Sequence, residues 1–593
     1  MQAAGTPSKG PWRQRFSALL RESSPALLSS LLHGGLFALS LPGVVHPWVG
    51  VSAAFLSLLP LVWLVKARGG RLALFLGLWL GQVPLWALQQ WWVLDVSELG
   101  FFPLVALQAC WAAVFVFVVQ WARRGVPWLP LPLLAAVAWA GVEFFRAQVF
   151  LTGYAWGLGG DALIEVPVLA APARVGGLSF IAFLMMLVVA GAWRLFAGQA
   201  EGLPRRWVGA VCVSAGLVGW IASAVLGRPV PVLMTSVRAG VVQTNLAQSN
   251  KIAWSIADEV RDFRRFMELT REASGADGTH GAPDFLVWPE TMAPGLTLDA
   301  ASLDALRRAQ VYFPVPAGVA GEQGTNLGAT ALSDALLAQQ REIGIPMLVG
   351  EEAIEGLVVK QDAQGRVDWA QDRRFNSAYL IERGEVQPAR YDKIHLTPFG
   401  EIMPVISRWG WLEDRLLAVA AGGMRFDLDE GKSLTVFEVP APNLKSGRVR
   451  LVTPICFEST DPALCRRLVF DGWSRRADVV VNLTNDGWLG DSDLAKRQHL
   501  RAARWRAFEL ATPVVRAANT GFSAVIGEDG RVIEQLGSRV DGVLRADVGI
   551  HPGTGATVYA RCGDWAGWSG LWGAALAAGL GLLRSRGAAR KPG

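Results

Sequence analysis

The stretch Thr453-Pro454-Ile455-Cys456-Phe457-Glu458 ends a β-rich run that begins at Val449, and it places a thiol where the predicted strand gives way to a turn. The next residues, Ser459-Thr460-Asp461-Pro462, are typical of a helix start. A cysteine between a strand and a helix lies at a sheet edge and near a helix N-terminus, and that setting lowers the pKa of a thiol. The pattern therefore predicts a reactive Cys456, and the alternative is a buried structural cysteine.

Two other strings also place a polar side chain at the end of an extended run or within one. Phe285-Leu286-Val287-Trp288 is a short apolar strand followed by Pro289-Glu290, and Lys393 lies in the alternating stretch Tyr391-Asp392-Lys393-Ile394-His395. A carboxylate can accept a thiol proton as a general base, and a lysine can donate to the oxyanion of a tetrahedral intermediate. Alone, Glu290 could be a capping or surface acid and Lys393 a solvated strand residue. Together with Cys456 they predict acyl-transfer chemistry.

The neighbours of these three residues leave several roles open. His395 is two residues from Lys393 and would share its face on a strand, which raises the alternative of a Cys–His pair. No Asn or Asp has the local setting that such a pair needs, so a packed, hydrogen-bonded histidine is favoured. Glu401 and Glu458 could orient Lys393, assist proton transfer or form salt bridges.

Residues 230–560 have the pattern of an α/β domain. Apolar residues recur at helical spacing over 255–272 and predict an amphipathic helix, and a second helix is predicted over 495–510. Short strands are predicted at Val237–Val242, Ile345–Gly350, Ser377–Ile381, Val479–Leu483, Val514–Ala518 and Ser523–Ile526, with a hairpin turn at Asp529-Gly530. The Gly- and Ala-rich segment 310–340 has no strong strand pattern before its last helical stretch, and we expect a variable loop there.

The rest of the chain is strongly apolar. Hydrophobic residues make up 52% of the 593, and 26 residues are tryptophans, which favour membrane–water interfaces. Runs of about 20 residues, the length that crosses a bilayer as a helix, lie near 25–41, 49–65, 72–94, 101–122, 127–145, 175–193, 207–227 and 565–583. We therefore expect eight spans, a seven-helix region over 25–229 and an eighth helix over 565–583.

Basic residues are concentrated in alternate short loops of this expected topology, and the loops between them are poor in Lys and Arg. They are Lys9, Arg13, Arg15, Arg21, Lys66, Arg68, Arg71, Arg123, Arg124, Arg194, Arg205, Arg206, Arg584, Arg586, Arg590 and Lys591. The loop 42–48 has none. Because Lys and Arg mark the cytoplasmic side, residues 1–24 and 584–593 are predicted to be cytoplasmic and 230–560 to lie on the outer side. This topology accounts for the net charge of +6, so nucleic acid is not an expected partner.

The loop at 146–174 faces the same side as the α/β domain and contains Thr152-Gly153-Tyr154-Ala155-Trp156. It could be an aromatic anchor in the membrane interface or a lipid-binding surface below the active site. Glu143 and Arg146, at the outer end of the fifth run, could pair, contact lipid headgroups or extend to the interface.

Taken together, the three strings resemble the nitrilase superfamily, whose catalytic trio is Glu–Lys–Cys. Asn482-Leu483-Thr484-Asn485-Asp486-Gly487-Trp488 also resembles that superfamily. With seven expected spans before the domain and one after it, the chain resembles the membrane-embedded branch, the apolipoprotein N-acyltransferases of bacterial inner membranes. The stretch from Lys393 to Glu401 is close to the extended lysine motif of that family, and the loop around Gly153 resembles its membrane-loop motif. The segment with Gln243, Asn245, Gln248 and Trp254 resembles its domain entry.

The resemblance implies a nitrilase-like αββα sandwich on an eight-helix transmembrane base, with the catalytic domain on the periplasmic side. It implies Glu290 as general base, Lys393 as oxyanion stabiliser and Cys456 as nucleophile, supported by Glu401, Glu458 and the aromatic Phe457. Gly153, Trp156 and Trp254 would belong to substrate-binding regions. The implied donor is a phospholipid, phosphatidylethanolamine by resemblance, and the implied acceptor is a diacylglyceryl apolipoprotein.

Two other functions remain as alternatives. A membrane-tethered nitrilase-type amidase would transfer the acyl group to water, and a non-catalytic lipoprotein-binding component would need none of the three chemical groups. The eight expected spans argue against the amidase, because a single membrane helix would suffice to anchor such an enzyme. The five cysteines show no CxxC spacing, and neither a metal nor a cofactor is expected. We expect a monomer.

Overall fold

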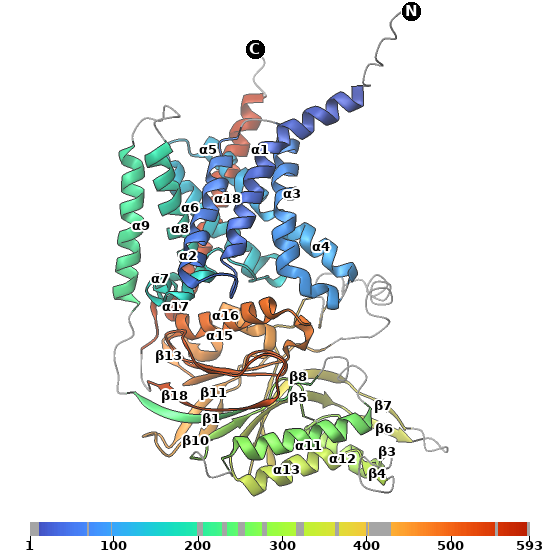
Figure 1. Cartoon of the computed structure of the whole chain (residues 1–593). Helices are drawn as coiled ribbons and strands as arrows, with labels where there is room; N and C mark the ends of the chain where they lie inside the picture. The colour runs from blue at the N-terminus through green and yellow to red at the C-terminus, as the bar shows by residue number, and fades with distance from the viewer. Residues whose placement is uncertain are drawn as a thin grey trace, which may run out of the picture.

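The computed structural model describes residues 11–67, 70–96, 98–197, 206–227, 234–246, 255–275, 281–293, 295–315, 325–361, 367–398, 401–402, 428–551 and 555–589. Trp254, one of the predicted substrate-binding residues, lies outside these ranges. A helical bundle forms one end of the molecule and a β-rich domain the other (Figure 1).

Two six-stranded sheets form the β-rich domain. The first has the strand order β18 (Gly542–Ile550), β1 (Thr235–Gln243), β2 (Phe285–Val287), β5 (Met347–Glu355), β8 (Arg373–Glu382) and β9 (Glu385–Asp392). The second has the order β10 (Phe437–Pro440), β11 (Arg448–Val452), β14 (Val479–Thr484), β15 (Val514–Ala518), β16 (Ala524–Ile526) and β17 (Val532–Gln535). The central pairs β1–β2, β2–β5, β11–β14 and β14–β15 are parallel, so their carboxyl ends point the same way within each sheet.

The sheets pack face to face, and helices cover both outer faces. Val241 and Leu348 of the first sheet share one apolar core with Leu451 and Val481 of the second. The outer face of the first sheet is covered by α11 (Ile256–Ala273) and α13 (Ala331–Ile343), and that of the second by α15 (Pro462–Val469) and α16 (Asp493–Leu510). All six residues of β14 are buried, as expected for a central strand covered on both faces. The predicted αββα sandwich is confirmed.

The segment 310–340 is not the strandless loop that its composition indicates. Tyr312–Val315 (β3) pairs antiparallel with Thr325–Gly328 (β4), and the segment continues into α13. Most of β3 is not buried, so it lacks the apolar alternation that reveals a strand in a sequence.

Nine longer helices form the bundle in the described residues: α1 (Pro11–Leu39), α2 (Pro47–Leu64), α3 (Arg71–Gln90), α4 (Glu98–Gln108), α5 (Trp111–Gly125), α6 (Leu131–Phe144), α8 (Ala173–Ala197), α9 (Trp207–Leu226) and α18 (Trp565–Ala589). Within the same described ranges, seven segments are long and apolar enough to cross a membrane, and α4 with α5 supplies one of them. Eight spans were expected. The expected first span, 25–41, falls in α1 and is the one that does not meet this measure.

Polar residues in the middle of α1 explain the difference. Ser30 donates to the carbonyl of Leu78 at 2.7 Å, and His33 Nδ1 lies 2.7 Å from the carbonyl of Ser57. These groups lower the hydropathy of α1, yet they are buried against α3 and α2. Average hydropathy therefore misses a helix whose polar side chains are satisfied inside the bundle.

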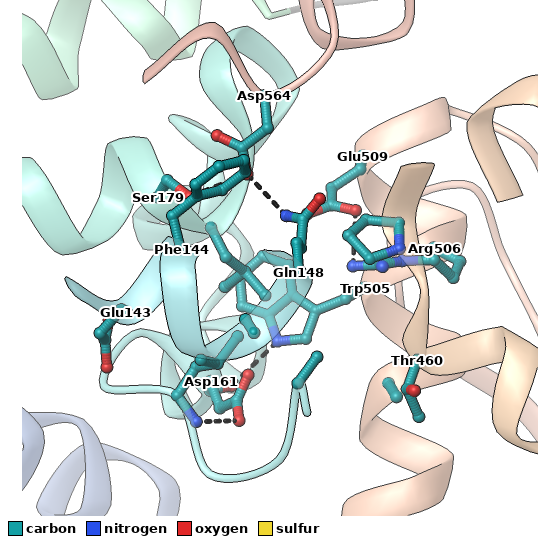
Figure 2. Close-up of a pocket in the computed structure, with 16 residues that line it drawn as sticks. Glu143, Phe144, Gln148, Asp161, Ser179, Thr460, Trp505, Arg506, Glu509 and Asp564 are labelled. Atoms are coloured by element: carbon teal, nitrogen blue, oxygen red, sulfur yellow. Dashed lines mark hydrogen bonds and ion pairs between the residues drawn. The ribbon is translucent and has the colours of Figure 1, made fainter. Parts of the chain in front are cut away.

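Helix α16 connects the sandwich to the bundle. Its Leu500 and Ala503 belong to the core of the sandwich. Its Arg501 and Arg504 form ion pairs of 3.1 and 2.8 Å with Glu165, which lies in a short helix between α6 and α8. A cavity of about 30 Å³ with several charged residues in its lining lies at this junction, and Figure 2 shows Glu509 and Arg506 of α16 on one side of it and Asp564 and Glu143 on the other. The sandwich thus rests on the bundle through charged contacts.

Glycines let α18 approach α5 and α6 closely. A Cβ at Gly141 of α6 would lie 2.5 Å from the main chain of Gly570, and a Cβ at Gly581 would collide with the carbonyl of Trp121 in α5. Side chains at these positions would force the backbones apart.

We predict that Gly570→Leu lowers the melting temperature of the purified protein in detergent. Overpacking of this kind costs about 1–3 kcal/mol. The matched control is Gly579→Leu on the same helix, where an added Cβ meets nothing within 4 Å. Equal melting temperatures for the two variants would contradict the proposed close contact.

Candidate active site

Four polar residues meet where strands of the two sheets end. Glu290 follows β2, Lys393 follows β9, Cys456 follows β11 and Asn485 follows β14. Lys393 Nζ lies 3.5 Å from Glu290 Oε1, and both groups act electrostatically on the Cys456 thiol. The structure therefore brings the three predicted residues together at the carboxyl ends of strands, the usual place for a site in a sheet with parallel strands.

Cys456 stands at a strained turn between β11 and the short helix Cys456–Thr460. Its φ of 51° is in the left-handed region, which an ordinary side chain rarely adopts. Burial and then the carboxylate of Glu290 raise the pKa of the Cys456 thiol, against the effect of Lys393. The expectation of a lowered thiol pKa is wrong, because burial and a neighbouring negative charge outweigh the amine and the turn.

The carboxylate of Glu290 is held on both oxygens. Oε1 accepts a hydrogen bond from Asn376 Nδ2, and Oε2 accepts one from the main-chain nitrogen of Asn485, each at 2.7 Å. Glu290 is 5% exposed, so these bonds fix its position in a site from which most water is excluded. Such a carboxylate has the placement that a general base requires.

Lys393 is a buried ammonium between two carboxylates. Its side chain is 1% exposed, and Nζ lies 2.7 Å from Glu401 Oε2. Burial lowers the pKa of Lys393, but Glu401 and Glu290 outweigh burial and raise that pKa above its ordinary value. Glu401 also accepts from the main-chain nitrogen of Thr397 at 2.8 Å. Lys393 therefore keeps its charge, as an oxyanion donor needs.

Glu458 joins the lysine segment to the cysteine turn. It is fully buried and accepts hydrogen bonds from the main-chain nitrogens of Ile394, His395 and Ile455 at 2.7–2.9 Å. The Tyr391 hydroxyl donates to it at 2.9 Å. Burial raises the pKa of Glu458 to about 7, although the three main-chain donors oppose this effect. Glu458 thus holds the lysine segment and the cysteine turn together. Its main-chain donors in the lysine segment are the nitrogens of Ile394 and His395, which follow Lys393.

His395 does not share a strand face with Lys393, because β9 ends at Asp392. Its Nδ1 lies 2.9 Å from Asp461 Oδ2, and its ring contacts that of Phe457 edge-on with centroids 5.6 Å apart. It is the packed, hydrogen-bonded histidine that the sequence favours. Phe457 serves as its packing partner.

The structure adds site residues that the sequence did not reveal. They are Asn376, which donates to Glu290 and Glu401, and the buried cluster of Asp486, His499 and Arg516 next to Cys456. Arg516 could have been found, because an arginine inside the buried-type run Val514–Ala518 requires an acidic partner. Asn376 gives no such signal, since its partners lie far away in the sequence.

The loop 146–174, called the membrane loop below, lies beside the cluster of Asp486, His499 and Arg516. Gly153 has a φ of 95°, and a Cβ there would lie 2.5 Å from the carbonyl of Ala147, so only glycine fits. Arg146 donates to the carbonyls of Trp156 and Gly157 at 2.7 and 3.0 Å, and Glu143 accepts from the main-chain nitrogen of Gly159 at 2.7 Å. These two ionisable residues therefore hold the loop, and the predicted lipid contacts of Gly153 and Trp156 stay a prediction.

Comparison with known proteins covers both parts of the chain. Residues 238–551 match the carbon-nitrogen hydrolase family, and residues 33–191 match the apolipoprotein N-acyltransferase N-terminal domain. An apolipoprotein N-acyltransferase from Bradyrhizobium diazoefficiens is 30% identical over 75% of this chain and 71% of its own length. One from Geobacter metallireducens is 27% identical over 94% of this chain and 95% of its own length. Among solved structures, an amidase from Nesterenkonia sp. aligns with 54% of this chain and 92% of its own length, at 18% identity and a TM-score of 0.33. The assignment of the fold therefore depends on the sheet topology and the family match, and not on this structure.

We predict that Glu290→Gln speeds alkylation of Cys456 several-fold, although it removes the general base. The substitution takes away a negative charge that raises the pKa of the thiol, so more thiolate is present at a given pH. Iodoacetamide labelling between about pH 7 and 9, followed by peptide mass spectrometry, measures the rate at Cys456. In the wild type this rate should rise across the whole range, because the thiol pKa lies above its ordinary value.

Glu528→Gln is the matched control, since Glu528 pairs with His551 outside the site. It should leave the Cys456 rate unchanged. Slower labelling of Cys456 in Glu290→Gln than in the wild type would show that the assigned electrostatics are wrong.

Proposed function

The chain belongs to the apolipoprotein N-acyltransferase family, and we propose that it transfers a fatty acyl chain from a phospholipid to the N-terminal amine of diacylglyceryl-cysteine on apolipoproteins. The observation that carries this proposal is the meeting of Glu290, Lys393 and Cys456 in a domain that rests on a membrane bundle. The trio supplies nucleophile, base and oxyanion donor, and the bundle supplies access to lipid. The family match extends over both parts.

The first half-reaction forms a thioester. Cys456 Sγ attacks the carbonyl carbon of the sn-1 ester while its proton passes to Glu290, and Lys393 donates to the oxyanion. The carbonyl then reforms, the bond to the glycerol oxygen breaks, and Glu290 returns the proton to that oxygen. A lysophospholipid leaves, and the acyl chain stays on Cys456.

The second half-reaction transfers the acyl chain to nitrogen. The free α-amine of the diacylglyceryl-cysteine attacks the thioester carbonyl, Lys393 again stabilises the oxyanion, and Glu290 takes a proton from the amine. Collapse breaks the carbon–sulfur bond, and the thiolate regains a proton from Glu290. One site can thus bind two bulky lipids in turn, because the acyl chain stays on the enzyme after the first lipid has left and before the second binds.

The raised thiol pKa supports a concerted first step. Burial and Glu290 both raise the pKa of the Cys456 thiol, which favours proton transfer to Glu290 during the attack over a standing thiolate. Excluding water from the same site protects the thioester from hydrolysis.

We further propose the bacterial inner membrane as the location, with the catalytic domain on the periplasmic side. The last turns of α5, α8 and α18 carry Arg123, Arg124, Arg194 and Arg586. The start of α1 and the end of α18 lie at the end of the bundle opposite the sheets (Figure 1). Positive charge at that end supports a cytoplasmic side there. Phosphatidylethanolamine as donor and a monomeric state belong to the same proposal.

An amidase acting on soluble amides is the weaker function. The carbon-nitrogen hydrolase match alone would permit it, but the curated relatives span the membrane part as well. Release of ammonia from soluble amides without lipid would support it.

The proposal predicts an acylated Cys456. Purified protein mixed with phosphatidylethanolamine vesicles should gain one fatty acyl mass on the peptide that contains Cys456, and a diacylglyceryl-cysteine peptide should then remove it. Cys456→Ser should lower N-acylation by about 10⁴-fold or more, because a residue that acts within a catalytic unit accounts for most of its rate. Glu290→Gln should slow acylation by about 10²–10⁴-fold.

Cys465→Ser is the control, because Cys465 is a buried thiol that belongs to the core of the sandwich. It should leave N-acylation near the wild-type rate. Wild-type turnover by Cys456→Ser would exclude the thioester mechanism.

A further inference from the structure

A second histidine–carboxylate pair lies against the nucleophile, and the mechanism above does not use it. His499 of α16 places Nδ1 2.8 Å from Asp486 Oδ1. Asp486 is held in turn by Arg516, whose Nη2 lies 2.8 and 2.9 Å from its two oxygens. All three side chains are buried, so the ring of His499 has a fixed orientation.

The other ring nitrogen faces the main chain of the nucleophile. His499 Nε2 lies 3.1 Å from the carbonyl oxygen of Cys456 and 3.1 Å from Ser459 Oγ. Carbonyl and carboxylate oxygens can only accept a hydrogen bond, so the contacts with Cys456 and Asp486 together require a proton on each ring nitrogen. His499 therefore acts on the backbone of Cys456, while Glu290 keeps the part of proton acceptor.

The backbone at Cys456 needs such support. A residue other than glycine in the left-handed region costs about 1–3 kcal/mol and persists only where its surroundings hold it. Asn482 Nδ2 donates to the carbonyl of Pro454 at 2.9 Å, and Glu458 accepts from the nitrogen of Ile455 at 2.7 Å. These bonds hold the chain before Cys456, and the bond from His499 holds the carbonyl of Cys456 itself.

The far side of the His499 ring contacts the membrane loop. Its centroid lies 6.0 Å from that of Trp156, which also packs against Trp92 and Tyr154. Trp156 donates through Nε1 to Gln498, the residue before His499. A continuous path of contacts thus runs from the loop through the His499 ring to the carbonyl of Cys456.

We propose that His499 is a positioning residue for the acyl-transfer reaction. Its Nε2–H holds the left-handed backbone of Cys456. Its packing on Trp156 makes the orientation of the thiol depend on the membrane loop. This inference rests on the proposed function. A thiol displaced by about 1 Å from its line of attack loses about 10²-fold in rate without loss of substrate binding.

Two amide substitutions separate the two ring nitrogens. The side-chain nitrogen of Gln can replace Nε2, and that of Asn can replace Nδ1. We expect His499→Gln to keep the bond to Cys456 and to form the thioester within about fivefold of the wild-type rate, and His499→Asn to be slowed by about 10–100-fold. The fall should lie in kcat and leave the KM for phosphatidylethanolamine vesicles unchanged. Single-turnover mass spectrometry of the Cys456 peptide measures these rates.

A double substitution tests the link to the loop. His499→Asn combined with Trp156→Leu should lose less than the product of the two single losses, because both changes interrupt the same path. His551→Asn is the control, since His551 Nδ1 lies 2.9 Å from Glu528 outside the site, and this variant should acylate at the wild-type rate.

Three outcomes would overturn the inference: equal rates for the Gln and Asn variants, a loss confined to KM, or a double variant that loses the full product. Melting temperatures identify variants that do not fold. If the double variant does not fold, the comparison of the rates of His499→Gln and His499→Asn decides for or against the inference. A wild type that forms no thioester would contradict the proposed function instead, so the two failures are distinguishable.

Discussion

The buried carboxylate of Glu458 joins the two sheets at the point where the chemistry needs them to meet. Lys393 directly precedes Ile394, and Cys456 directly follows Ile455, and Glu458 accepts from both of those main-chain nitrogens. Because β9 and β11 belong to different sheets, no ladder hydrogen bond could fix this spacing. Burying a carboxylate is costly, and main-chain donors with the Tyr391 hydroxyl offset that cost. A single side chain thereby sets the distance between amine and thiol.

Helix α16 extends this geometry to the membrane. One side of it packs into the core of the sandwich, and its arginines reach Glu165 in the bundle. His499 lies on the same helix, between the membrane loop and Cys456. The membrane loop and the nucleophile are therefore parts of one packed unit.

The sequence indicated Glu290, Lys393 and Cys456 because each lies in or at the end of an extended run, which is a local signal, and the structure brings the three together. It could not predict Asn376 or which acid pairs with Arg516, since those contacts join segments that only folding brings together. The prediction of a lowered thiol pKa was wrong for a related reason. The turn at Cys456 follows from neighbouring residues in the sequence, whereas the burial of the thiol and its proximity to Glu290 arise only from the fold. Of the eight expected spans, the first does not meet the hydropathy measure, because Ser30 and His33 lower the mean over α1, while their hydrogen bonds depend on neighbouring helices.

The glycine contacts of α18 impose an order on biosynthesis. The faces of α5 and α6 near Gly125 and Gly141 are shaped to receive the backbone of α18. In chain order that helix follows the α/β domain. A nascent chain must therefore make its earlier helices and the intervening domain while these faces have no helix α18 against them. The bundle can reach this packing only after α18 has been made, so a ribosome that stalls inside the intervening domain leaves an incomplete bundle.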